Sequence, residues 1–191
     1  MSQTIVIAGD ASNGSQIQSG NDGTVVIQSG LAGAKVNALS IAANGNMSLP
    51  ASAAPCFSAY QSGAAQSIPN AVYTKIQFNT KEFDITNAYD AATNFRFQPL
   101  VAGYYQVNAE VLVSTLASPL VVSIYKNSAE FKRGIQVNSV NGGVVSSIVF
   151  MNGTTDYLEI FAYQASGAAN ALSSGSGVVF NYFNAAMIRP A

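Results

Sequence analysis

Few side chains in this sequence have the types that enzymes use for acid–base or nucleophilic chemistry. The 191 residues include no histidine, which is the commonest general base and a frequent zinc ligand. The one cysteine, Cys56, can form neither an intrachain disulfide nor a cysteine cluster for a metal ion. We therefore expect a protein that is not an enzyme and that needs no cofactor.

One pair of carboxylates has a spacing that resembles a glycosidase site. Glu82 and Asp84 are two residues apart, so on a strand they would share a face at a separation of about 7 Å. Lys81 precedes them, and a solvated strand edge explains the same three residues. We expect the strand edge, with no catalytic residue in the chain.

A second group of oxygen-bearing side chains follows in the sequence. Asp84, Asn87 and Asp90 have the oxygen ligands that calcium prefers, but the same residue types build turns. We expect turns here and no metal site.

Four further residues have side chains that could react or bind a partner. Cys56 precedes Phe57 at an expected strand start, which favours a small buried side chain over a reactive thiol. Lys132 and Arg133 are expected in a solvated loop, with contact to an anionic glycan or to a capsid as the alternative. Tyr104 is a candidate for stacking on a sugar ring.

The composition indicates extensive contact between subunits. Hydrophobic residues make up 49% of the chain and charged residues 9%, whereas charged residues are about 25% of an ordinary soluble protein. A surface with so few charges is difficult to keep monomeric. The net charge is −1 and the basic residues are dispersed, so we expect no nucleic-acid partner.

Neither a secretion signal nor a membrane span is expected. The start, MSQT, has no basic segment followed by a long apolar one, which predicts synthesis in the cytosol. No uninterrupted apolar run reaches the roughly 18 residues that a transmembrane helix needs.

Residues 1–50 alternate short β-branched segments with Gly, Asn, Ser and Asp. Strands are predicted at 4–7, 24–27, 39–41 and 47–49, and the first two share the pattern Thr followed by three β-branched residues. Such short strands bury no core alone. We expect a glycine-rich β stalk or anchoring arm over 1–50, with an arm that orders only on binding as the alternative.

A linker-like stretch begins at residue 51, and longer segments in which apolar and polar residues alternate follow it. The alternation predicts strands at 72–78, 107–113, 121–125, 144–150 and 157–163. Turn residues separate them, among them those at 141–143, 152–153 and 173–177. No window has a helical stripe, so residues 51–191 are predicted to form one all-β sandwich or barrel.

The spacing of aromatic residues from Phe78 to Tyr105 is specific enough to compare with a family. Asp84, Tyr89, Phe97, Gly103 and Tyr105 follow Phe78 at intervals that resemble the globular head of complement component one-q and its tumour-necrosis-factor-like relatives. Phe97 comes one residue late, and aliphatic residues replace the family's aromatic ones at positions 107 and 109. Segments 57–59, 153–160 and 183–188 resemble the family's opening strand, a late alternating strand and the closing strand.

This resemblance implies a ten-stranded jelly-roll sandwich that assembles as a homotrimer, with its inner sheet facing the threefold axis. The last strand is predicted to be apolar on both faces, with positions 178, 180 and 182 on one side and 179 and 183 on the other. A strand buried on both sides in a small domain needs a neighbouring chain. The candidate core or trimer-interface residues are Phe78, Tyr89, Phe97, Gly103, Tyr105, Phe180, Tyr182 and Phe183.

The glycine-rich segments at 31–41 and 44–46 resemble the shaft of bacteriophage fibres. Together, the two resemblances imply a non-enzymatic bacteriophage protein on the virion surface, made in the host cytoplasm. It is either a trimeric fibre or spike head that attaches to the host, or a capsid decoration. Other virion proteins would bind residues 1–50, and a host-surface glycan is a further candidate partner. The alternatives are a glycan-active enzyme of a tail spike and a cell-surface adhesion module.

Overall fold

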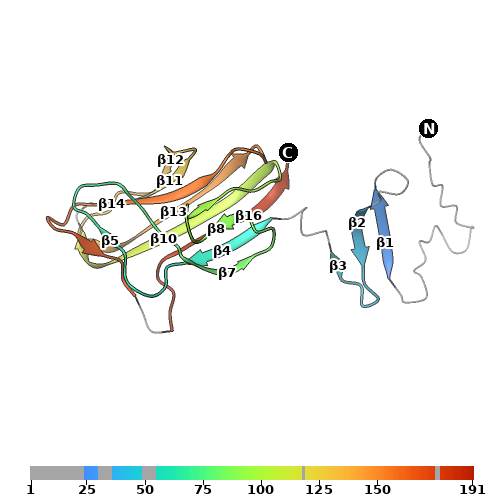
Figure 1. Cartoon of the computed structure of the whole chain (residues 1–191), viewed down its shortest axis with the longest axis horizontal. Coiled ribbons are helices and arrows are strands. Elements are labelled where there is room, and N and C mark those ends of the chain that lie inside the picture. The colour runs from blue at the N-terminus through green and yellow to red at the C-terminus, as the bar shows by residue number, and fades with distance from the viewer. Residues whose placement is uncertain (1–23, 30–35, 49–54, 118, 175–176) are drawn as a thin grey trace, which may run out of the picture. The chain divides into compact units, whose positions relative to one another are not determined.

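The computed structural model describes residues 24–29, 36–48, 55–117, 119–174 and 177–191 (Figure 1). Its regular elements are all strands, and no helix in these ranges could cross a membrane. The chain divides into two compact units, Met1–Pro50 and Ala51–Ala191.

The first unit contains a small antiparallel sheet. Its strands β1 (Val25–Ser29), β2 (Val36–Ile41) and β3 (Met47–Ser48) pair in the order β1-β2-β3. Gly45 has a φ of 84°, a left-handed conformation that favours glycine, in the turn between β2 and β3. Strands predicted at 24–27, 39–41 and 47–49 are thus confirmed where the structure describes them, whereas the segment 4–7 lies outside the described residues.

The second unit has two facing sheets, and the first of them has five antiparallel strands in the order β13-β10-β16-β4-β7. Its long strands alternate buried and exposed side chains, as the sequence pattern predicts. Their bounds are β4 (Cys56–Tyr60), β7 (Thr80–Asp84), β10 (Gly103–Ala117), β13 (Val140–Met151) and β16 (Tyr182–Pro190).

The facing sheet has the order β12-β11-β14-β9-β8, with β6 pairing beside β9 on β14. Two further short strands, β5 (Ser67–Ile68) and β15 (Asn170–Ala171), pair with each other. The bounds of the larger sheet's strands are β6 (Thr74–Lys75), β8 (Tyr89–Asp90), β9 (Arg96–Phe97), β11 (Leu120–Lys126), β12 (Ala129–Arg133) and β14 (Leu158–Gln164).

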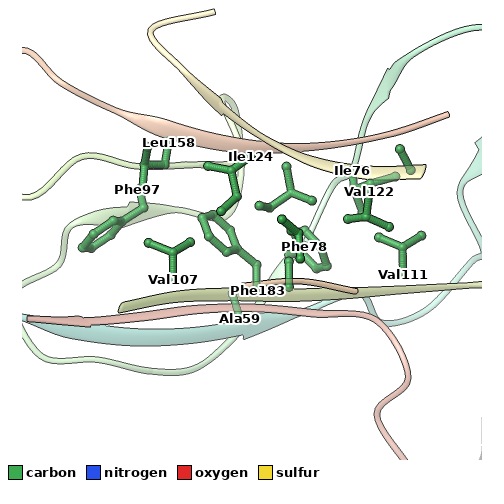
Figure 2. Packing of buried hydrophobic residues seen from close by; sticks show 14 of the residues in the cluster. Ala59, Ile76, Phe78, Phe97, Val107, Val111, Val122, Ile124, Leu158 and Phe183 are labelled. Atoms are coloured by element: carbon green, nitrogen blue, oxygen red, sulfur yellow. The ribbon is translucent and has the colours of Figure 1, made fainter. Parts of the chain in front are cut away.

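The core lies between these sheets. Figure 2 shows Leu158 and Ile124 of one sheet above Val107 and Phe183 of the other. Phe57 is at the centre of an aromatic group: its ring stacks on Tyr89 and Phe97 at 4.7 and 4.5 Å between centroids, and meets Phe183 edge-on at 4.8 Å. Full burial of each such ring stabilises the fold by about 1.5–3 kcal/mol.

Among the core or interface candidates, Phe78, Tyr89, Phe97, Tyr105 and Phe183 are almost completely buried in the core of the single chain. Gly103 lies where β10 and β16 approach closely, and a Cβ there would come within 2.5 Å of the Arg189 carbonyl oxygen. Tyr182 and Phe180 are only half-buried.

The prediction of a last strand beginning at 178 was wrong. β16 begins at Tyr182, and Val178 and Val179 are exposed in the preceding loop. The Asn181 side chain explains where pairing stops, because its Oδ1 accepts the Leu112 N–H at 2.7 Å and its Nδ2 donates to the Ser173 carbonyl. A side chain therefore takes the backbone donor that a longer β16 would use.

Two other strand boundaries differ from the prediction. Residues 141–143 were predicted as a turn but lie inside β13, where Gly143 packs so closely that a Cβ would come within 3.0 Å of Val122 Cγ2. The predicted strand at 72–78 is regular only in β6, although Ile76 still donates its N–H to the Ile160 carbonyl. Because of such interruptions the sandwich contains more strand segments, β4 to β16, than the ten strands predicted.

Candidate interaction surface

The outward face of the five-stranded sheet is the most distinctive surface of the second unit. Odd-numbered residues of β10 and β13 enter the core, so the even-numbered ones point away from it. Cross-strand pairing arranges the outward side chains in rows that run across the sheet. One of these rows consists of Ser146, Asn108, Asn184 and Ser58, each on a neighbouring strand.

One end of this face is apolar and open to solvent. Tyr104 and Phe150 are cross-strand partners with ring centroids 5.4 Å apart, and they are 44% and 43% exposed. Ile148 and Ile188, 53% and 54% exposed, lie near them. Tyr104 and both isoleucines line a hollow of about 540 Å³ that extends to the last residue, Ala191. The face therefore exposes large apolar side chains that a monomer in water would leave unpacked.

The middle of the face is polar without being charged. Asn108 donates to the Asn184 Oδ1 at 3.0 Å and accepts from Ser146 at 2.8 Å. Gln106 donates to Ser146 at 2.9 Å. The amide and hydroxyl groups of neighbouring strands are thus linked to one another.

Charges on this face are few, and one of them, Arg189, is the cross-strand partner of Tyr104 and lines the hollow at the apolar end. Glu82 accepts from the Ser58 hydroxyl at 2.6 Å. Burial, followed by the neighbouring Glu110 carboxylate, raises the pKa of Tyr182 above its ordinary value, so its hydroxyl stays protonated. A charge-poor patch with exposed aromatic residues has the composition of the core of a protein–protein interface.

The sequence analysis predicted that one sheet faces the threefold axis but named none of the residues at the apolar end of this face except Tyr104, although the signal was available. It treated the alternating segments at 107–113 and 144–150 only as strands with a buried side. The opposite set of positions, which includes Ile148 and Phe150, is also apolar at one end. A strand that is apolar on both faces would have marked the surface.

The two carboxylates with glycosidase-like spacing do not form a common site. Asp84 is almost fully buried, and it accepts the N–H groups of Ala88 and Tyr89 and the Lys81 ammonium at 2.8–3.0 Å. Glu82 is exposed and bonds to Ser58 on the outward face. β7 is an edge strand, as predicted, but the Asp84 side chain is buried in a turn and not solvated.

The oxygen atoms considered as possible calcium ligands accept hydrogen bonds from the protein. Asn87 Oδ1 accepts from the Lys81 ammonium at 2.9 Å. Asp90 accepts the backbone N–H groups of Ala92, Thr93 and Asn94, and these bonds hold the pKa of its carboxyl well below the usual range. In the described ranges no group of three His, Cys, Asp or Glu could hold a metal ion.

The remaining candidates lie at separate places. Cys56 begins β4 and is half-buried, less than predicted. Lys132 and Arg133 belong to the exposed strand β12, so the predicted loop was wrong, and the Arg133 guanidinium pairs with both oxygens of Glu130 at 2.7 and 2.6 Å. Tyr104 lies on the apolar end of the outward face.

Comparison with known proteins identifies the fold of the second unit. No protein family and no curated protein matches the sequence. The structure is similar to murine APRIL at pH 5.0, with a TM-score of 0.53 and 10% identity over 71% of this chain and 99% of that chain. It is also similar to the PRD1 vertex protein P5, with a TM-score of 0.50 and 18% identity over 72% of this chain and 97% of that chain.

These similarities confirm the predicted resemblance of the head at the level of the fold. Residues 55–191 form a jelly roll of the tumour-necrosis-factor and complement one-q type. The resemblance of the first unit to a fibre shaft stays a prediction.

Proposed function

We propose that the chain is a non-enzymatic bacteriophage protein of the virion surface that assembles as a homotrimer. The observation that carries the proposal is the outward face of the five-stranded sheet, with its apolar end and uncharged polar middle. In the proposed trimer, two further copies of the same chain bind to this face.

A threefold arrangement explains why the middle of the face carries amides and hydroxyls. Identical side chains approach one another near a symmetry axis, where like charges would repel. Asn108, Asn184 and Ser146 have both donors and acceptors, so they can pair with their own copies. The apolar end around Ile148 and Phe150 supplies the hydrophobic contribution to association.

The virion location is supported by the fold shared with a phage vertex protein. Residues 1–50 would attach the protein to other virion proteins. Two versions of the role remain: a fibre or spike head that contacts the host surface, and a capsid decoration that covers coat subunits. Binding through three identical heads gives avidity without strong single contacts.

The two alternative functions make different demands on the chain. A glycan-active enzyme of a tail spike needs a pair of accessible carboxylates, whereas Asp84 is buried in a turn and Glu82 lies on the interface face. A cell-surface adhesion module would use the same trimeric head without a virion. Immunolabelling of phage particles separates that alternative from the proposal.

The first test is the mass of the full chain in solution by light scattering. We expect three times the 19.8 kDa of one chain. Ile148→Lys places a charge at the apolar end and should give monomers, because three buried ammonium groups would lie near one another. Ile135→Lys, at a position 69% exposed outside this face, is the matched control and should stay trimeric. A monomeric wild-type chain would refute the assembly.

A further inference from the structure

A separate polar pocket lies where β7, β8 and β9 meet. It has a volume of about 620 Å³. Four amide side chains and two cations contribute to its lining: Asn79, Asn87, Asn94, Gln98, Lys81 and Arg96. None of these residues belongs to the outward rows of the five-stranded sheet described above.

The wall of the pocket is held in place by two carboxylates that serve the backbone. Asp90 accepts the N–H groups of Ala92, Thr93 and Asn94 at 3.0 Å each, and Asn94 Nδ2 at 2.7 Å. Asp84 fixes the neighbouring turn in the same way. Because N–H donors take these oxygens, the pocket needs little rearrangement to receive a ligand.

Arg96 is the group in this pocket that lacks a natural counter-ion. Its guanidinium lies over the Tyr157 ring, 4.5 Å from the centroid, and no ion pair in the described part of the chain includes it. Asp90 is its cross-strand partner but directs its oxygens into its own turn. Arginine forms paired hydrogen bonds with carboxylates, so an oriented guanidinium without a protein carboxylate indicates an external one.

The other lining groups fit the hydroxyls of a sugar. Amide side chains offer both donors and acceptors, as hydroxyl groups do. Lys81 is already paired with Asp84, so the pocket has no cluster of free cations of the kind that would favour a polyphosphate. Thr86, which also lines the pocket, has the one buried side-chain polar atom without a hydrogen-bond partner among the described residues.

We propose that this pocket binds a saccharide that carries a carboxylate, with Arg96 holding the carboxylate and the amides holding hydroxyls. That the saccharide belongs to a host surface rests on the attachment role proposed above, whereas the pocket itself lies within one chain. The trimer, tested by light scattering, and the saccharide site, tested by binding, can therefore be refuted independently of each other.

The experiment is a titration of the full chain, followed by saturation-transfer NMR, with methyl glucuronide and the methyl glycoside of N-acetylneuraminic acid. Methyl glucoside and the methyl ester of the bound acid are the neutral controls. We expect binding of at least one acid and affinity for its neutral counterpart that is lower by about ten-fold, the effect of losing one charge-assisted contact. Failure of both acids to bind, or equal binding of the neutral sugars, would overturn the proposal.

Variants locate the binding in the pocket. Arg96→Gln should weaken binding of the acid by about ten-fold. Arg133→Gln is the matched control, because Arg133 also lies over a tyrosine ring but is paired with Glu130 of its own strand, β12, and does not line the pocket. If Arg96→Gln does not fold, Gln98→Ala should weaken binding and keep the preference for the acid. Unchanged binding in a folded pocket variant would refute the assignment.

Discussion

At the scale of single residues, two glycines in turns show two different reasons why a turn can require glycine: a left-handed backbone and a lack of space for a side chain. Gly153 and Gly63 both have a positive φ, 72° and 74°. A Cβ at 153 would come within 2.3 Å of the Ala102 nitrogen, whereas a Cβ at 63 would meet nothing within 4 Å. An alanine at either position would therefore strain the backbone, but only an alanine at 153 would also clash with neighbouring atoms.

We expect Gly63→Ala to lower the free energy of unfolding by about 1 kcal/mol through backbone strain alone. Gly153→Ala should lower it by about 3 kcal/mol or more, because β10 and the loop before it would have to move. Urea denaturation at one fixed protein concentration measures both values. Equal losses would show that the close approach to Ala102 does not exist.

A buried tyrosine links the core to pH. The Tyr105 hydroxyl donates to the Val101 carbonyl at 2.8 Å, and burial raises the pKa of Tyr105 to about 12. The pKa of Tyr89 is raised in the same direction, first by burial and then by Asp90. Above about pH 10 the unfolded chain loses these protons while the folded chain keeps them, so stability should fall as pH rises toward 12.

Tyr105→Phe should make that fall shallower, by up to about 1.4 kcal/mol per pH unit for the one proton removed. At neutral pH the same variant should be less stable by about 1 kcal/mol, because the hydrogen bond to Val101 is lost. Unfolding free energies at about pH 8 and pH 11 provide the test. The same slope in wild type and variant would mean that Tyr105 is not the titrating group.

At the scale of elements, long alternating strands were predictable and short ones were not. β10, β11, β13 and β14 each contain a segment whose period of two is visible in the sequence. β5, β6, β8, β9 and β15 have two residues each. β5, β6, β9 and β15 pair with strands far along the chain, whereas β8 pairs with the adjacent β9. Gly142 and Gly143 resemble a turn by composition but serve close packing inside a strand.

The β8–β9 connection shows how one side chain builds an element. Asp90→Ala removes an acceptor for the N–H groups of residues 92–94 and should lower the free energy of unfolding by about 2 kcal/mol. Arg133→Ala breaks the exposed pair with Glu130, leaves the hydrogen bond from Ser123 to Glu130 in place, and should cost much less stability, because exposed ion pairs contribute little. Thermal unfolding of both variants beside wild type makes the comparison, and a smaller loss for Asp90→Ala would contradict the structure.

At the scale of the whole molecule, the sequence indicated the sandwich but not the surface that the sandwich exposes. The aromatic spacing from Phe78 to Tyr105 identified a core, and those rings are buried within one chain. The predicted trimer contacts at Phe180 and Tyr182 came from a strand that begins later than expected. Which outward side chains lie beside one another depends on registers such as Asn108 with Ser146 and Asn184, and a single sequence does not reveal cross-strand registers.

The position of this face within the chain leads to the last prediction. All of its rows belong to residues 56–189, and the strands of the first unit pair with each other through β2. A chain that starts at Ala51 should therefore keep three copies together, with light scattering giving three times its own mass. If the shortened chain is monomeric while the full chain is a trimer, residues 1–50 hold the assembly and the outward face has another occupant. A trimer in both assigns assembly to the sheet face and leaves residues 1–50 free to attach the protein to the virion.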